Sequence, residues 1–273
     1  MMDHQREALD MLQIQILDIQ KKVLGTSHES GTGVALVHAL SYQKGDTVQL
    51  TVPRKGLYLL QLDESLGTQV VYLGKTATYP VPVEALEKTC FSPAAFNGSP
   101  HLLTLCEAPA STGTTYRNLA ENPYDNHQTT GVFPHATANV ETRNEMVFAA
   151  RNAIDGILEN RSHGEYPYQS WGINSNPKAE LTIHFGRPVV IDMVRLTLRA
   201  DWPHDSYWTE ATLTFSDETT FACSLEKTFL PQSFKMEKKT ITSIKLGNLL
   251  KADDASQFPA LTQLEVFGVE KIV

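Results

Sequence analysis

The residue types best suited to chemistry in this chain are gathered between positions 199 and 208. This stretch of ten residues holds two tryptophans, a tyrosine, a histidine, an arginine and two aspartates. Pro203 excludes a regular helix or a central strand here, so we predict a loop between two strands. Aromatic rings beside planar charged groups suit the apolar C–H face and the hydroxyl rim of a sugar. The side chains that we predict to contact such a ligand are Arg199, Asp201, Trp202, His204, Tyr207 and Trp208.

A structural interpretation of the same loop stays open beside the functional one. In it, Trp202 and Trp208 pack under the edge of the fold, and Arg199 forms an ion pair with Asp201 or Asp205. Loops hold a disproportionate share of the binding residues of proteins. For that reason the sequence favours the functional interpretation.

Two further polar stretches can add groups to the same end of the fold. Residues 163–174 combine aromatic rings with polar side chains, and they supply His163 and Glu165 as further candidate ligand-binding residues. Trp171 in this stretch is predicted to belong to the core. Residues 139–145 can contribute polar groups as well, but the favoured interpretation of that stretch is a solvated, capped helix start.

The elements that position these residues are predicted to be strands. Most apolar runs are four to eight residues long and follow a period of two. A turn-rich stretch at 107–118 predicts a domain boundary. We therefore predict an all-β chain of two antiparallel β-sandwich (jelly-roll) domains with a few short helices, one domain covering residues 1–112 and the other residues 113–273.

Three local patterns refine this prediction. Pro53–Gly56 lies between the alternating runs 48–52 and 57–62, where it predicts a hairpin turn with a glycine available for a positive φ. Residues 83–88, which follow a proline, predict a short helix. Residues 145–154 predict the one helix of the C-terminal domain.

Composition excludes several functional classes. Lys and Arg number 23 against 31 Asp and Glu, a formal net charge of −8, and no basic cluster is visible, which argues against a nucleic-acid partner. No apolar run reaches the roughly 18 residues of a membrane-spanning helix. The apolar stretch 12–19 is interrupted by polar residues, unlike a signal peptide, and the three cysteines form no metal or redox pair. We therefore expect no membrane association and a cytoplasmic location.

Four short motifs follow one another across the C-terminal half: Asn118–Ala120, Ala153–Gly156, Ser170–Trp171 and Leu264–Gly268. In this order they resemble the discoidin-like domains, also called coagulation-factor C-type domains or family 32 carbohydrate-binding modules. The resemblance covers roughly residues 116–269. It implies a galactose-binding-like jelly roll with ligand-binding loops at one end of the sandwich, and it implies a saccharide or glycan as the partner.

The same resemblance implies a structural calcium ion and no organic cofactor. In that family the ion often lies near the aspartate of the A-I-D-G turn and near a glutamate of the last strand, which are Asp155 and Glu265 here. Calcium takes six to eight oxygen ligands, and Asn160 is within reach as a further one. The expected metal ligands are therefore Asp155, Asn160 and Glu265.

The function that these observations predict is non-catalytic carbohydrate binding through loops at one end of the C-terminal sandwich. A glycan-active enzyme of the glycoside hydrolase type is an alternative, with Asp201 and either Asp205 or Glu165 as the acid–base pair, since such enzymes place two carboxyls about 5–10 Å apart. A protein-interaction module is another, because Trp, Tyr and Arg are also the usual anchors of protein interfaces. The choice of sugar, the oligomeric state and the role of the N-terminal domain stay open.

Overall fold

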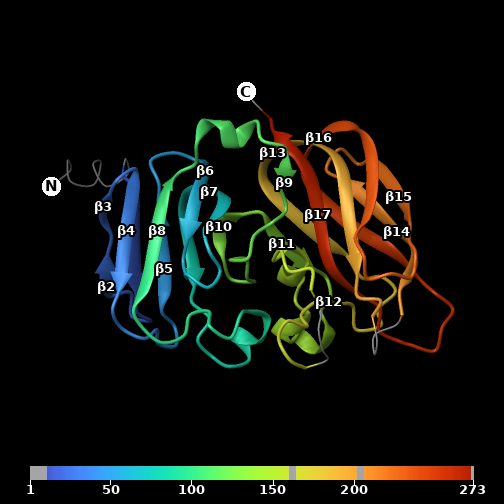
Figure 1. Ribbon diagram of the computed structural model, residues 1–273, viewed down its shortest axis with the longest axis horizontal. Helices are drawn as coiled ribbons and strands as arrows, with labels where there is room; N and C mark the ends of the chain where they lie inside the picture. The colour runs from blue at the N-terminus through green and yellow to red at the C-terminus, as the bar shows by residue number, and fades with distance from the viewer. Residues whose placement is uncertain (1–10, 160–163, 202–205, 272–273) are drawn as a thin grey trace. The chain divides into compact units, whose positions relative to one another are not determined.

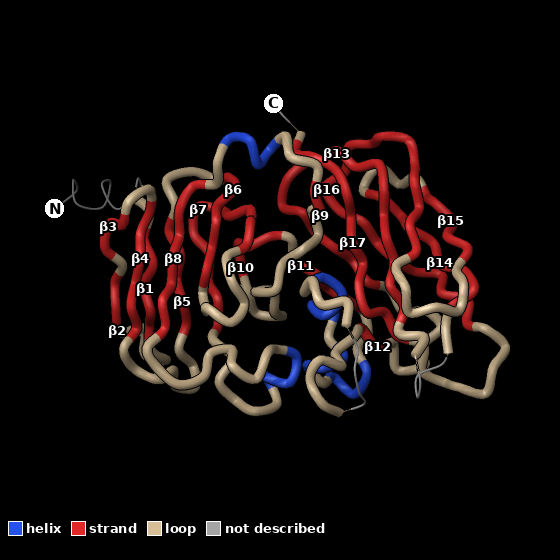
Figure 2. Tube along the Cα trace, viewed as in Figure 1, coloured by secondary structure: helices blue, strands red, loops and turns tan. Residues whose placement is uncertain are grey.

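The structure is a computed structural model that describes residues 11–159, 164–201 and 206–271 (Figure 1). The fold is all-β, as the sequence predicts. The strands form two antiparallel sheets, and the helical segments of the described residues are short 3-10 turns (Figure 2). Within these ranges, no helix is long and apolar enough to cross a membrane.

The chain divides into two compact units. The N-terminal unit consists of Met1–Thr112 together with Asn126–Phe133, and the C-terminal unit consists of Gly113–Asp125 together with Pro134–Val273. The short return of the chain to the N-terminal unit is absent from the predicted division into 1–112 and 113–273. It is stabilised by main-chain pairing with a distant strand, which local composition does not reveal.

The N-terminal unit is a nine-stranded sheet in the order β2-β1-β5-β7-β6-β8-β4-β3, with β10 paired to β7. Several of its strands alternate between buried and less buried positions, as on β1, where Ile14 and Ile16 have no exposed surface. The strands are β1 (Gln13–Leu17), β2 (Val23–Thr26), β3 (His28–Ser30), β4 (Gly33–His38), β5 (Thr47–Thr51), β6 (Gly56–Gln61), β7 (Gln69–Pro80), β8 (His101–Glu107) and β10 (Thr130–Phe133).

The segment Pro53–Gly56 is not a hairpin turn. The strands on either side of it, β5 and β6, both pair antiparallel with β7, so they run in the same direction. β5 pairs with residues 76–80 of β7, and β6 pairs with residues 69–73. The hairpin prediction was wrong because local turn chemistry does not show that one long strand pairs with both runs.

The C-terminal unit is an eight-stranded sheet in the order β12-β17-β13-β16-β14-β15, with β11 paired to β13 and β9 to β17. Its long strands contain register shifts, such as the one between Ile191 and Met193, where a strand can bend around the core. The core includes Trp171, Phe185 and Trp208. The strands are β9 (Arg117–Asn118), β11 (His135–Ala138), β12 (Trp171–Gly172), β13 (Leu181–Leu198), β14 (Trp208–Phe215), β15 (Thr220–Ser224), β16 (Gln232–Lys251) and β17 (Ala260–Glu270).

The helix predicted at 145–154 is replaced by separate 3-10 turns. Within this segment Glu145 (φ −91°, ψ 136°) and Ala149 (φ −72°, ψ 156°) have extended backbone, so no continuous helix can span it. The helix predicted at 83–88 is likewise only a 3-10 turn that begins at Glu87. The five turns are η1 (Glu87–Cys90), η2 (Ala110–Gly113), η3 (Thr142–Asn144), η4 (Met146–Phe148) and η5 (Ala150–Ile154).

Candidate functional site

Trp208 lies in the core of the C-terminal unit. Its side chain is 1 % exposed, and its ring centroid lies 6.3 Å from that of Trp171. A sealed indole cannot stack against a sugar, so the prediction that Trp208 contacts a ligand is wrong. The physical reason is its place on β14, where it falls on the inward face. Trp171 is buried as predicted, and its Nε1 donates to the carbonyl of Val140 at 3.1 Å.

Several other predicted residues either lie away from the pocket or lie outside the described ranges. Among the residues that the structure describes, Glu165 is exposed and Tyr207 is partly buried, and neither lines the pocket described below. Five predicted residues lie outside the described ranges, so their roles stay predictions. These five are Asn160, His163, Trp202, His204 and Asp205.

Arg199 follows directly on β13, and its side chain is buried. Its Nη1 donates to the backbone carbonyl of Tyr168, and its Nε lies 3.6 Å from Oδ1 of Asp201. Burial lowers the pKa of the guanidinium, and the carboxylate of Asp201 acts in the opposite direction. The ion pair of the structural interpretation therefore exists. Arg199 also lines a pocket, so the two interpretations of this residue are compatible.

The pocket has a volume of about 220 Å³ and lies within the C-terminal unit. Three chain segments form its wall together with Arg199, and one of them is the stretch for which a solvated helix start was the favoured interpretation. Because that interpretation was favoured, the contribution of this stretch to the pocket was not predicted. The lining residues are Thr142, Arg143, Phe148, Ser170, Gly172, Ile173, Asn174, Ser175, Arg199, Phe258, Pro259 and Ala260.

The wall of the pocket combines aromatic surface with planar polar groups. The ring of Phe258 is 56 % exposed. The guanidinium carbon of Arg143 lies 5.1 Å from the ring centroid of Phe148, and its Nε and Nη2 each donate to Glu145 at 2.7 Å. The ring contact and the ion pair, whose side chains are 60 % and 44 % exposed, favour one orientation of the guanidinium. With the amide of Asn174, the pocket offers apolar surface and hydrogen-bonding groups side by side.

One position in the pocket requires a glycine. A Cβ atom on Gly172 would lie 2.6 Å from Oγ1 of Thr142. That hydroxyl also accepts a hydrogen bond from the backbone N–H of Asn174 at 2.9 Å. The absence of a side chain at 172 therefore lets two segments of the wall approach each other closely.

Phe258, Phe148 and Asn174 were not predicted as site residues. Phe258 lies between β16 and β17, next to a proline and outside any alternating run, after the polar stretch 253–257. An aromatic residue in such a place was the sequence feature from which a site residue could have been predicted. Phe148 and Asn174 carried no comparable signal, because their position depends on how distant segments pack.

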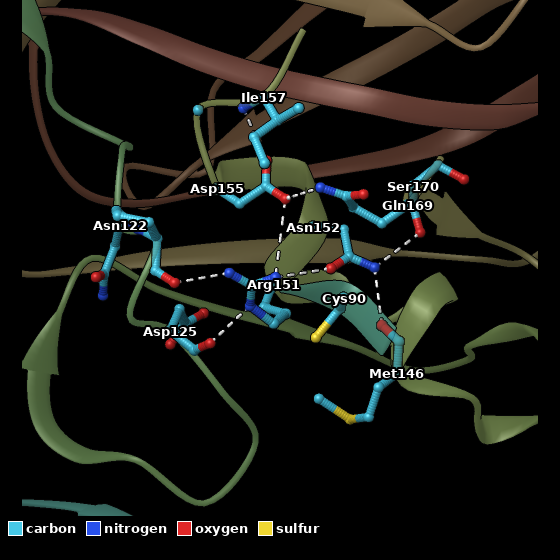
Figure 3. A network of polar contacts seen from close by, with 12 residues as sticks. Cys90, Asn122, Asp125, Met146, Arg151, Asn152, Asp155, Ile157, Gln169 and Ser170 are labelled. Atoms are coloured by element: carbon cyan, nitrogen blue, oxygen red, sulfur yellow. Dashed lines mark hydrogen bonds and ion pairs between the residues drawn. The ribbon is translucent and has the colours of Figure 1, made fainter. Parts of the chain in front are cut away.

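Asp155 does not fit the predicted calcium site. Its Oδ1 accepts a hydrogen bond from the backbone N–H of Ile157 at 2.9 Å, and its Oδ2 accepts one from Nε2 of Gln169 at 3.1 Å (Figure 3). Oδ1 also accepts a hydrogen bond from Nε2 of Gln263 at 2.6 Å. A calcium ion needs oxygen lone pairs that here point at N–H groups. Burial raises the pKa of this carboxyl to about 6, although Arg151 acts to lower it.

Glu265 has separate partners. Its Oε1 lies 3.4 Å from Nη1 of Arg195, and its Oε2 has no hydrogen-bond partner among the described residues. Burial raises the pKa of this carboxyl, which favours the neutral acid. Within the described part of the chain, neither Asp155 nor Glu265 belongs to a cluster of three potential metal ligands.

One such cluster does occur in the N-terminal unit, formed by Asp63, Glu64 and His101, with ligand atoms within 4.8 Å of one another. The carboxylate of Asp63 is already occupied. Its Oδ1 accepts from the N–H and the hydroxyl of Ser65, and its Oδ2 accepts from the N–H of Phe96 at 2.8 Å. These contacts fasten two loops, so the cluster has a structural explanation.

Comparison with known proteins gives similarity to solved structures only. No family model and no curated protein matches the sequence. The chain is similar to chitosan-binding module 1 of a chitosanase/glucanase from Paenibacillus sp. IK-5, with 16 % identity and a TM-score of 0.40, over 55 % of this chain and 98 % of that one.

Two other similar structures bind monosaccharides according to their descriptions. One is the family 32 carbohydrate-binding module of NanJ from C. perfringens in complex with galactose, with 14 % identity and a TM-score of 0.39, over 56 % of this chain and 99 % of that one. The other is a Streptococcus pneumoniae fucose-binding module, with 15 % identity and a TM-score of 0.38, over 55 % of this chain and 94 % of that one. Similarity at this level does not identify the ligand of the present chain.

Proposed function

We propose that the C-terminal unit binds carbohydrate in the pocket lined by Arg143, Asn174, Arg199 and Phe258. The observation that carries this proposal is an exposed aromatic residue, Phe258, that lines one cavity together with two guanidinium groups and an amide group. A sugar presents an apolar C–H face and a rim of hydroxyls, and such a wall complements both. A cavity of about 220 Å³ lies below the range of drug-sized pockets, so it suits one sugar ring of a longer glycan.

Binding without catalysis is the form of the proposal that the wall supports. Glycoside hydrolysis generally needs two carboxyl groups about 5–10 Å apart across the scissile bond. Among the described residues, no Asp or Glu lines the pocket. Two carboxylates contact its arginines: Asp201 faces the guanidinium of Arg199, and Glu145 accepts from that of Arg143. The pocket can therefore hold a ligand but lacks, within the described ranges, the pair of groups that would cleave it.

The test is a screen of immobilised glycans followed by calorimetric titration of the ligands that bind. We expect Phe258→Ala to weaken binding about 2- to 10-fold, the loss of one aromatic contact. Phe229→Ala is the matched control, because Phe229 is 62 % exposed in the same unit and does not line the pocket. Equal affinities of the two variants, or no glycan bound by the wild type, would contradict the proposal.

A further inference from the structure

The C-terminal unit contains a buried ion pair formed by Arg151 and Asp155 (Figure 3). Both side chains are 2 % exposed, and Nη1 of the arginine lies 3.8 Å from Oδ2 of the aspartate. A buried carboxylate is costly unless a positive charge and hydrogen bonds compensate it. The fold must therefore place a cation beside Asp155, and this cation can be either a metal ion or a charged side chain.

The guanidinium of Arg151 gathers oxygen atoms from separate segments of the chain. Its Nε donates to the carbonyl of Asp125 at 2.7 Å, and its Nη2 donates to the carbonyl of Pro123 at 2.7 Å. Its Nη1 donates to Oδ1 of Asn152 at 3.0 Å. Backbone carbonyls, an amide oxygen and a carboxylate are the ligands that a calcium ion collects. In this unit, these oxygen atoms surround the guanidinium group of Arg151.

Asp155 completes the arrangement from the other side. Nε2 of Gln263, on β17, donates both to Oδ1 of Asp155 and to the carbonyl of Asn152 at 2.7 Å. The backbone N–H of Gly156 donates to Oε1 of the same glutamine at 3.1 Å. A neutral amide that donates in this position suits a carboxylate already paired with a guanidinium. A metal ion would require an oxygen ligand there.

We propose that the guanidinium of Arg151 replaces the structural divalent cation of this sandwich. It joins the segment 122–125 to the A-I-D-G turn, as a bound ion would. An arginine carries its charge at every pH at which proteins fold, and it cannot dissociate. The stability of the C-terminal unit is therefore independent of calcium, in contrast to what the resemblance of its sequence motifs implied.

The first test uses the wild-type chain. All three tryptophans belong to the C-terminal unit, so intrinsic tryptophan fluorescence reports the unfolding of this unit alone. We expect the same Tm after exhaustive treatment with EDTA and in millimolar calcium chloride, and no stoichiometric metal by elemental analysis. A lower Tm after EDTA, or one bound calcium per chain, would overturn the proposal.

The second test removes the guanidinium of Arg151 and supplies a carboxylate that can bind a metal ion in its place. Arg151→Met should lower the Tm by about 10 °C, because it leaves a buried charge without its partner. In the double variant Arg151→Met with Gln263→Glu, a second carboxylate replaces the amide donor. We expect millimolar calcium to raise the Tm of the double variant and to leave that of the wild type unchanged.

Arg187→Met is the matched control for the double variant. Arg187 is also buried and pairs with Glu270 at 2.6 Å in the same unit, so its loss should lower the Tm without creating a response to calcium. An unchanged Tm of Arg151→Met, or a double variant that ignores calcium, would refute the exchange of guanidinium for metal. If Arg151→Met does not fold, EDTA treatment and elemental analysis of the wild type decide the question.

Discussion

Replacing Trp208 by alanine separates a core residue from a ligand-binding residue. The indole is 1 % exposed and packs beside Trp171. Truncating a buried aromatic side chain to alanine costs about 3–5 kcal/mol, because it loses apolar burial and leaves a cavity. We therefore expect Trp208→Ala to lower the free energy of unfolding of the C-terminal unit by about 4 kcal/mol.

Trp208→Phe refines the same prediction. Nε1 of Trp208 has no hydrogen-bond partner among the described residues, and a buried unpaired donor costs about 1–3 kcal/mol. Phenylalanine keeps most of the ring and removes this donor. We expect it to cost less than half as much as alanine.

The assay is urea denaturation followed by the fluorescence of the remaining tryptophans, both of which belong to the same unit. Glycan affinity is measured in parallel, under conditions where each variant is folded. A loss of less than about 1 kcal/mol for Trp208→Ala, combined with abolished glycan binding, would refute the assignment of this residue to the core.

Three further predictions concern the C-terminal unit. Gly268→Ala should lower the Tm strongly, because the added Cβ would lie 2.0 Å from the carbonyl oxygen of Val190; a wild-type melt would contradict this. The hydrogen bond from His135 to Asp125, at 2.6 Å, raises the pKa of the histidine above 6.5, so its contribution to stability should be complete below pH 6.5 and disappear as the pH rises through the raised pKa. Unfolding free energies at several pH values should show this loss in the wild type and not in His135→Gln. Burial raises the pKa of Cys223 to about 12, so its thiol should react with Ellman's reagent only after unfolding. The test uses a variant with Cys90→Ser and Cys106→Ser, because Cys106 is partly exposed, and rapid labelling of this variant in the native state would disprove the protection of Cys223.

The sequence was sufficient to predict that most elements are strands, and it was insufficient to predict how those strands pair or that the two predicted helices are short 3-10 turns. Runs such as residues 12–16 alternate between apolar and polar residues, and this period-two pattern alone predicts a strand with one buried face. The partner of a strand is a long-range choice. The segment Pro53–Gly56 has the residues of a hairpin turn, yet β7 pairs with both neighbouring strands and prevents it.

The candidate site, too, could be predicted only in part from the sequence. Its loops could be located from the crowding of aromatic and charged residues, and Arg199 and the stretch around Trp171 do lie at the pocket or beside it. The sequence could not determine which ring faces solvent. Trp208 carried the stronger signal, but the inward face of β14 buries it, and the exposed ring is that of Phe258.

The amino-acid sequence by itself determined that this chain is all-β and that its polar and aromatic side chains gather in a few loops, because these properties depend on local composition and periodicity. Only the tertiary structure decided which of those side chains form a pocket and which cation compensates Asp155. Both outcomes depend on contacts between residues far apart in the chain, such as Gln263 with Asp155 and Arg151 with Pro123. The sequence of a single segment does not reveal such contacts.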